Sequence, residues 1–219
     1  MMRTIHYSAL IFLWVNLFFT DMGFASERSD KMINQFKFYK IGGEDTVDTA
    51  AEKLDTINYH CVRGNATFLE TKSVQNSLHN QKASERIKEL VVMDEVLEDH
   101  GRGLEIEEMP IEALVCTPPD KYPFSTSAYF FSGFEKKLLT FWIKIRKIDM
   151  VREKLVAKFG YCVKEGYCEG ENSVLFLVDK NGWHLHVYFF NNIKSHYERI
   201  KRIVELNNEK IKENINEAF

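Results

Sequence analysis

The sequence lacks the short motifs by which many enzymes and nucleic-acid-binding proteins are recognised. It contains no nucleophile elbow, no phosphate-binding loop, no zinc-spaced cysteine pairs and no nucleic-acid-binding signature. The absence of C-x-x-C argues against a redox-active cysteine, and the absence of D-x-D-x-D-G argues against an EF-hand calcium site. Motifs therefore define no catalytic set in this chain.

The sequence also lacks an excess of charge of either sign. Its 29 lysine and arginine residues against 32 aspartate and glutamate residues give a formal net charge of −3. A chain so close to neutrality has no overall field that would attract nucleic acid or an anionic membrane, so we expect no nucleic-acid partner. With 219 residues, 45% of them hydrophobic, the chain is long enough for one large domain or two small ones.

The chain begins with the layout of a secretory signal peptide over residues 1–25. A positively charged start precedes an apolar run over residues 9–19, and Gly23 and Ala25 occupy positions −3 and −1 of a cleavage site. The apolar run is shorter than the roughly 20 residues that cross a bilayer, which argues against an uncleaved anchor. We expect an exported domain over residues 26–219, periplasmic or extracellular and not membrane-spanning after cleavage.

Four cysteines remain in the expected mature chain: Cys61, Cys116, Cys162 and Cys168. An even number of cysteines in an oxidising compartment indicates two disulfides, for which three pairings are open. The turn-forming segment between Cys162 and Cys168 favours a local bridge, which leaves Cys61 with Cys116. On the chain-entropy argument the short bridge contributes about 2.4 kcal/mol to stability and the long bridge about 4.2 kcal/mol.

The clearest secondary-structure pattern covers residues 125–190, which we predict to form a hairpin, a helix and a second hairpin. Asp149 is a suitable N-cap for this helix, and Gly160 stands where a left-handed C-terminal residue is favoured. Alternation predicts that Leu139 and Phe141 share a core face with residues of the second hairpin. The expected strands cover residues 125–131, 138–145, 174–178 and 183–190.

Weaker patterns predict the remaining elements. A capping box of Ser195 and Glu198 is expected to open a long C-terminal helix, and Asp45 or Thr46 can cap an earlier helix. The other expected elements are a short strand over residues 35–41, a strand over 59–68, a loop over 70–82, a helix over 84–97 and a strand over 110–116.

This order of elements predicts an α+β fold. Runs of hairpins with helices between them favour an antiparallel sheet built from hairpins, with helices packed on one face. Both halves of the chain open with strand, helix and strand, which suggests two similar lobes over residues 35–98 and 104–219. The sequence contains no convincing repeat that would establish this duplication.

Candidate functional residues are concentrated in the last expected strand. Alternation places His184, His186 and Tyr188 on one face of this strand, and we expect Trp142 of the preceding hairpin to lie near by. Aromatic residues are enriched in protein-binding surfaces. We predict that Trp142, His184, His186 and Tyr188 bind a partner, which we expect to be a protein.

The same histidines support an alternative, a metal-dependent or acid/base enzyme. Two histidines at positions i and i+2 can ligate one metal ion, and His60 or His196 could add a third donor. Spacing does not define this third ligand, so we assign no cofactor and no catalytic residue. The sequence therefore predicts an exported binding or inhibitor-like protein that acts on another macromolecule without catalysis, with the enzyme as the alternative.

Overall fold

The computed structural model describes residues 36–66, 88–90, 92–93, 111–160, 162–163, 166–179 and 182–218. The signal peptide expected over residues 1–25 and the loop expected over residues 70–82 lie outside these ranges. Of the helix expected over residues 84–97, the five described residues are helical.

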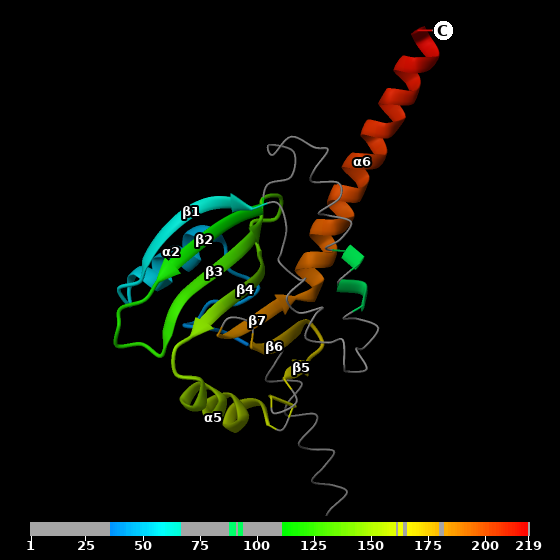
Figure 1. Ribbon diagram of the computed structural model, residues 1–219. Coiled ribbons are helices and arrows are strands. Elements are labelled where there is room, and N and C mark those ends of the chain that lie inside the picture. The colour runs from blue at the N-terminus through cyan, green and yellow to red at the C-terminus, as the bar shows by residue number, and fades with distance from the viewer. Residues whose placement is uncertain are drawn as a thin grey trace, which may run out of the picture.

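Seven strands of the described chain form one antiparallel sheet (Figure 1). They are β1 (His60–Ala66), β2 (Ile111–Thr117), β3 (Phe124–Ser132), β4 (Leu138–Ile145), β5 (Tyr167–Glu169), β6 (Ser173–Asp179) and β7 (Trp183–Phe189). Their order across the sheet is β1-β2-β3-β4-β7-β6-β5. Because β4 pairs with β7, both hairpins of the sequence prediction belong to one continuous sheet. The α+β class is confirmed, whereas the two similar lobes are not.

Helices lie on both faces of this sheet. They are α2 (Val47–Asp55), α5 (Ile148–Phe159) and α6 (Phe190–Ala218). We call the face that packs against α2 and α5 the closed face, and the opposite face, which carries His184 and His186, the histidine face. The first turns of α6 bury Phe190 and Ile193 on the histidine face, which differs from the expectation of helices on one face. Figure 1 shows the C-terminal half of α6 projecting away from the sheet.

The closed face holds the larger apolar core. Phe141 of β4 and Val187 of β7 are directly paired and fully buried there. The ring of Phe36, from the segment before α2, stacks on Phe141 with centroids 5.8 Å apart, and it lies 5.3 Å from the ring of Phe159 in α5. These rings join the sheet, α5 and the N-terminal segment into one hydrophobic cluster.

The prediction that Leu139 shares the core face of Phe141 was wrong. Phe131 pairs with Leu138 and Phe130 pairs with Thr140, so the register shifts there and Leu139 is the extra residue of a β-bulge. The bulge turns the buried Leu139 side chain into the cluster on the histidine face. A bulge reverses the alternation of faces on one side of itself, which a strict period of two does not anticipate.

Of the short strand expected over residues 35–41, the described residues 36–41 form a tight turn instead. The backbone N–H groups of Phe38 and Ile41 each donate to the other's carbonyl over 2.9 Å. Between them Tyr39 and Lys40 have φ angles of 49° and 67°, as in the two-residue turns that close hairpins. The apolar residues of this segment therefore reach the core from a turn and not from a strand.

Two predicted helix starts were also wrong. Lys147 precedes the first residue of α5 and makes no side-chain capping bond, while Asp149 lies within the first turn, where its charge suits the helix dipole. α6 begins at Phe190, directly after β7, and the hydroxyl of Ser195 donates to Glu135 instead of capping. By contrast, the Thr46 cap of α2 is confirmed.

Both disulfides have the pairing that the sequence favours. Cys61–Cys116 joins directly paired positions of β1 and β2, and Cys162–Cys168 closes the segment before β5. Such bridges persist in oxidising compartments, so they indicate an exported protein. No helix in the described part of the chain has the length and apolar character needed to cross a membrane.

Candidate functional site

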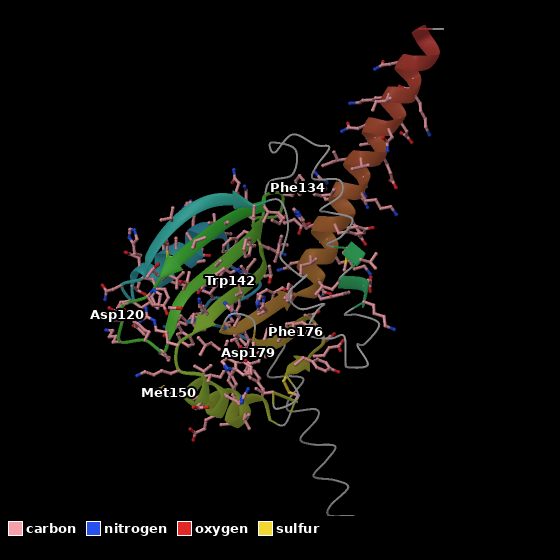
Figure 2. The ribbon with its side chains drawn as sticks, in the orientation of Figure 1. Asp120, Phe134, Trp142, Met150, Phe176 and Asp179 are labelled. Atoms are coloured by element: carbon pink, nitrogen blue, oxygen red, sulfur yellow. A yellow bond between two sulfur atoms is a disulfide. The ribbon has the colours of Figure 1, made fainter. Side chains whose placement is uncertain are left out.

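The four residues predicted to bind a partner do gather on the histidine face. Strand pairing between β4 and β7 sets their arrangement, because directly paired residues of an antiparallel sheet share a face. Trp142 is labelled in Figure 2 near the middle of the sheet. The paired residues on this face are Trp142 with His186, Lys144 with His184, and Thr140 with Tyr188.

Their rings form a continuous row. The ring centroids of Trp142 and His184 are 5.9 Å apart in an edge-on arrangement. Those of His184 and His186 are 6.2 Å apart, and those of His186 and Tyr188 are 6.3 Å apart with nearly parallel planes. Contacts of this kind stabilise ring pairs beyond the effect of burial alone.

Burial divides this row into an outer and an inner part. Tyr188 is fully buried and His186 is only 6% exposed, whereas Trp142 and His184 are half-buried. Trp142 and His184 can therefore contact a partner directly. His186 and Tyr188 lie beneath the surface and pack against them.

Both histidines of the row favour the neutral form. Burial lowers the pKa of His186 to about 4, and the neighbouring His184 acts in the same direction. Burial also lowers the pKa of His184, helped by the charge of Lys144 and opposed by a hydrogen bond with the backbone of Gly182. Neutral imidazoles on this face can accept a hydrogen bond or a metal ion.

The third metal donor expected from His60 or His196 does not reach the two histidines. His60 lies on β1, four strand spacings from β7, which is roughly 19 Å at ~4.8 Å per strand. His196 lies in α6 and contacts Ser132. Among the residues that the structure describes, no group of three or more His, Cys, Asp and Glu could hold a metal ion.

The contact between Ser132 and His196 joins a serine to a histidine that are 64 positions apart, and sequence spacing gave no sign of it. His196 Nδ1 lies 2.9 Å from Ser132 Oγ, and the Glu135 backbone N–H donates to the same hydroxyl over 3.2 Å. Both side chains are fully buried, so a substrate cannot reach this nucleophile and base. The pair instead fixes α6 to the turn between β3 and β4. Burial lowers the pKa of His196 to about 4, against the opposing charge of Glu135.

An apolar row continues from this cluster to the edge of the sheet. Strand pairing aligns Val62, Val115, Ala128, Trp142 and His186 across β1, β2, β3, β4 and β7. The two valines at its outer end are 60% and 44% exposed. On the histidine face, α6 and the helical residues Leu90 and Met93 pack in one cluster that also buries Ile111 and Ala113 of β2. Among the described residues of this face, the exposed apolar stretch beside β1 is limited to Val62 and Val115.

The two edges of the sheet differ in length and protection. At one edge, β5 has only three residues. At the other, β1 has seven residues with no proline and no bulge in its pairing with β2, and its charged side chain, Arg63, is paired with Asp48 of α2. Natural sheets commonly protect a long edge by such devices, and no described residue pairs with the outer side of β1.

The disulfide of β1 shows which backbone groups point outward. The Cα atoms of Cys61 and Cys116 are 4.1 Å apart, the short spacing of a pair that exchanges no backbone hydrogen bonds. Alternation then directs the N–H and C=O groups of Cys61, Arg63 and Asn65 away from β2. We define the β1 edge surface as this outer edge together with Val62, Val115, Trp142 and His184.

Comparisons with family models, with curated proteins and with solved structures found no match to this chain. The functional proposal therefore rests on the β1 edge surface.

Proposed function

We propose that this chain is an exported binding protein that acts on another protein without catalysis. Its two disulfides support a working place in an oxidising compartment, the periplasm or the outside of the cell. The observation that carries the proposal is the seven-residue edge strand β1, whose outer side pairs with no described strand, with Val62 and Val115 exposed beside it.

The backbone groups at the edge of β1 favour a partner with an extended segment. The outward N–H and C=O groups of Cys61, Arg63 and Asn65 form a row of donors and acceptors that an extended segment of another protein can pair with. The exposed Val62 and Val115 give that segment an apolar surface on one face. We therefore propose a partner strand with apolar residues at alternate positions, packed beside Val62. Trp142 and His184 lie three and four strands further across the sheet from β1, so they can contact only another part of the same partner.

The enzyme alternative built on His184 and His186 has weaker support. His186 is buried, and the described residues bring no third ligand to the pair.

Two substitutions at one position test the edge directly. Arg63→Pro removes an N–H that points outward and leaves the pairing of β1 with β2 in place, since proline is tolerated on that side of an edge strand. Arg63→Ala is the matched control, because it loses the same ion pair with Asp48 but keeps the N–H.

The parent protein, immobilised with its disulfides intact, is incubated with proteins of its native exported fraction, and bound proteins are quantified by mass spectrometry. We expect a partner that Arg63→Ala retains and that Arg63→Pro and Val62→Lys lose. Hydrogen exchange of the complex should then show new protection at Arg63 and Asn65. Equal binding by all variants, or protection confined to other strands, would contradict the proposal, as would sedimentation showing only a dimer of this chain.

A further inference from the structure

A pocket of about 250 Å³ lies on another part of the molecule, away from the β1 edge surface. Four separate segments meet there: the loop before α2, the end of the turn between β3 and β4, the turn between β5 and β6, and the start of α6. Amide and charged side chains from these segments line it together with the edges of the largely buried rings of Phe36 and Phe189.

Hydrogen bonds hold the walls of this pocket in place. The side-chain amide of Asn192 donates to the carbonyl of Gly43 over 2.7 Å and to that of Leu138 over 2.8 Å, and the amide of Asn191 donates to Asn172. Gly43 is required for this packing, because a Cβ there would lie 2.8 Å from the ring of Phe189. The pocket is therefore formed before any ligand binds.

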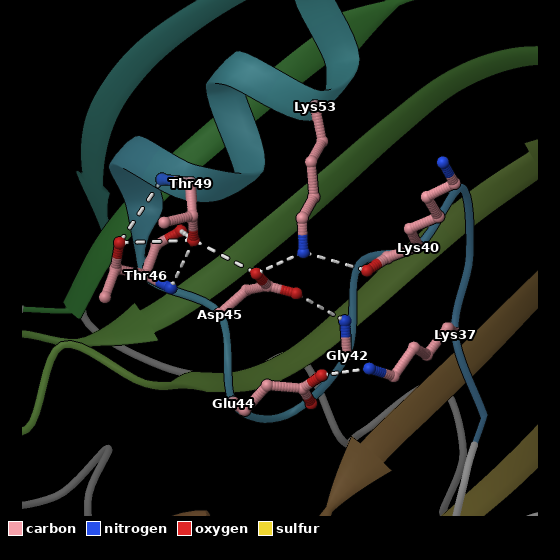
Figure 3. Close-up of polar contacts among 8 residues, drawn as sticks. All are labelled: Lys37, Lys40, Gly42, Glu44, Asp45, Thr46, Thr49 and Lys53. Carbon is pink, nitrogen blue, oxygen red and sulfur yellow. Dashed lines mark hydrogen bonds and ion pairs between the residues drawn. The ribbon is translucent and has the colours of Figure 1, made fainter.

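The loop that forms one wall is fixed from behind by a buried carboxylate. Asp45 accepts a hydrogen bond from the Gly42 backbone over 2.9 Å and from the Thr49 hydroxyl over 3.1 Å, and it pairs with Lys53 over 2.5 Å. Figure 3 shows this network next to the ion pair of Lys37 with Glu44, two residues that line the pocket. The loop is thus held at its base while these two side chains remain exposed at the rim.

The charges around the pocket do not balance. Glu44 compensates Lys37, but the described residues supply no carboxylate partner for Lys137, which is exposed and lines the same pocket. The first turn of α6 contains no acidic residue either. The ammonium group of Lys137 and the second N–H of the Asn191 amide, next to apolar rings, match the chemistry of an oxyanion attached to a small ring.

We propose that this pocket binds a small organic anion, in which a carboxylate or phosphate group contacts Lys137 and Asn191 and a ring lies against Phe36 and Phe189. The site is separate from the β1 edge surface and does not depend on its function.

The proposal is tested by titrating the ¹⁵N-labelled, disulfide-bonded protein with phenyl phosphate and with benzoate, followed by amide chemical shifts. We expect saturable shifts around Gly43, Lys137 and Asn191, and the tighter of the two probes identifies the preferred oxyanion. Lys137→Met, which keeps the aliphatic stem, should weaken binding about tenfold, because a charge-assisted hydrogen bond is lost. Asn191→Ala should weaken it to a smaller extent.

A control variant and an uncharged probe test whether binding depends on Lys137 and on the anionic group. Lys154→Met removes an exposed lysine of α5 and should leave the affinity unchanged. Benzyl alcohol tests the ring without a charge and should bind more weakly than either anion. Absence of saturable shifts with both anions, equal affinity of Lys137→Met and the parent, or equal binding of benzyl alcohol would each overturn the proposal.

Discussion

The two faces of the sheet are buried to a similar degree in the centre but are filled differently. The closed face relies on rings and aliphatic side chains such as Phe141, Leu185 and Val187. The interior on the histidine face includes His186 and, through α6, His196. Burial of polar groups costs free energy that apolar groups do not. Both faces bury polar atoms, since Tyr59, Ser127 and Tyr129 do so on the closed face. Among the described residues the buried imidazoles lie on the histidine face, which also carries the exposed Val62 and Val115, and there we place function.

The largest expected effect is the difference in stability loss between substitutions of Phe141 and Trp142, which are adjacent in β4 but lie on opposite faces. Phe141→Ala empties a fully buried site on the closed face and should lower the free energy of unfolding by about 4 kcal/mol. Trp142→Ala acts on a half-buried site of the histidine face and should lower it by about 2 kcal/mol, while weakening partner binding. Urea unfolding with intact disulfides measures both. A larger loss for Trp142→Ala would reverse the comparison.

The second largest effect on stability is expected from acid, through the two buried histidines His186 and His196. Burial holds the pKa of His186 and His196 at about 4, against an ordinary value of 6.5. As pH falls below 6.5, these histidines become protonated in the unfolded chain but stay neutral in the folded chain. The free energy of unfolding therefore declines down to about pH 4. The expected loss is about 3 kcal/mol per histidine.

Variants at each histidine check this prediction. His186→Leu and His196→Gln should each flatten the dependence of the unfolding free energy on pH between 4 and 6.5. His60→Gln, at an exposed position of β1, serves as the control. If removing both buried histidines left the slope unchanged, carboxylates and not the histidine face would account for the acid sensitivity.

The smallest effect on stability is expected at the open end of the histidine face. Val62→Lys and Val115→Lys place a charge on side chains that are already exposed, so the free energy of unfolding should change by no more than about 0.5 kcal/mol. Partner binding should nevertheless be lost with both. A stability loss of several kcal/mol would mean that these valines belong to the core and would remove them from the β1 edge surface.

Local signals were sufficient for much of the sheet. Alternation of Phe141 and Ile143 against Trp142 predicted β4, and the turn residues from Asp179 to Gly182 predicted the hairpin of β6 and β7. In the structure Gly182 has a φ of 105°. These features depend on neighbours in sequence, which a single chain displays.

The errors arose where distant contacts decide the local structure. The capping box at Ser195 was outweighed because Asn192 bonds to carbonyls 149 and 54 positions away, which favours an earlier start of α6. The bulge at Leu139 depends on its pairing with β3. No residue pattern near either position reveals these partners.

The candidate site was predictable only in part. Alternation grouped His184, His186 and Tyr188 correctly, because one strand carries all three. The row from Trp142 to Val62 depends on the register of three strand pairs, and the burial of His186 depends on the fold as a whole. Sequence spacing contains neither kind of information.

The disulfide between β1 and β2 also has a mechanical consequence. A partner that pulls on β1 from the His60 end would break its hydrogen bonds to β2 one at a time, as in unzipping. Cys61 is the next residue, and its covalent bond to Cys116 stops the peeling there. Tension then passes to β2 and spreads over the whole sheet, so the strand proposed to hold a partner can bear a load without detaching from its own protein.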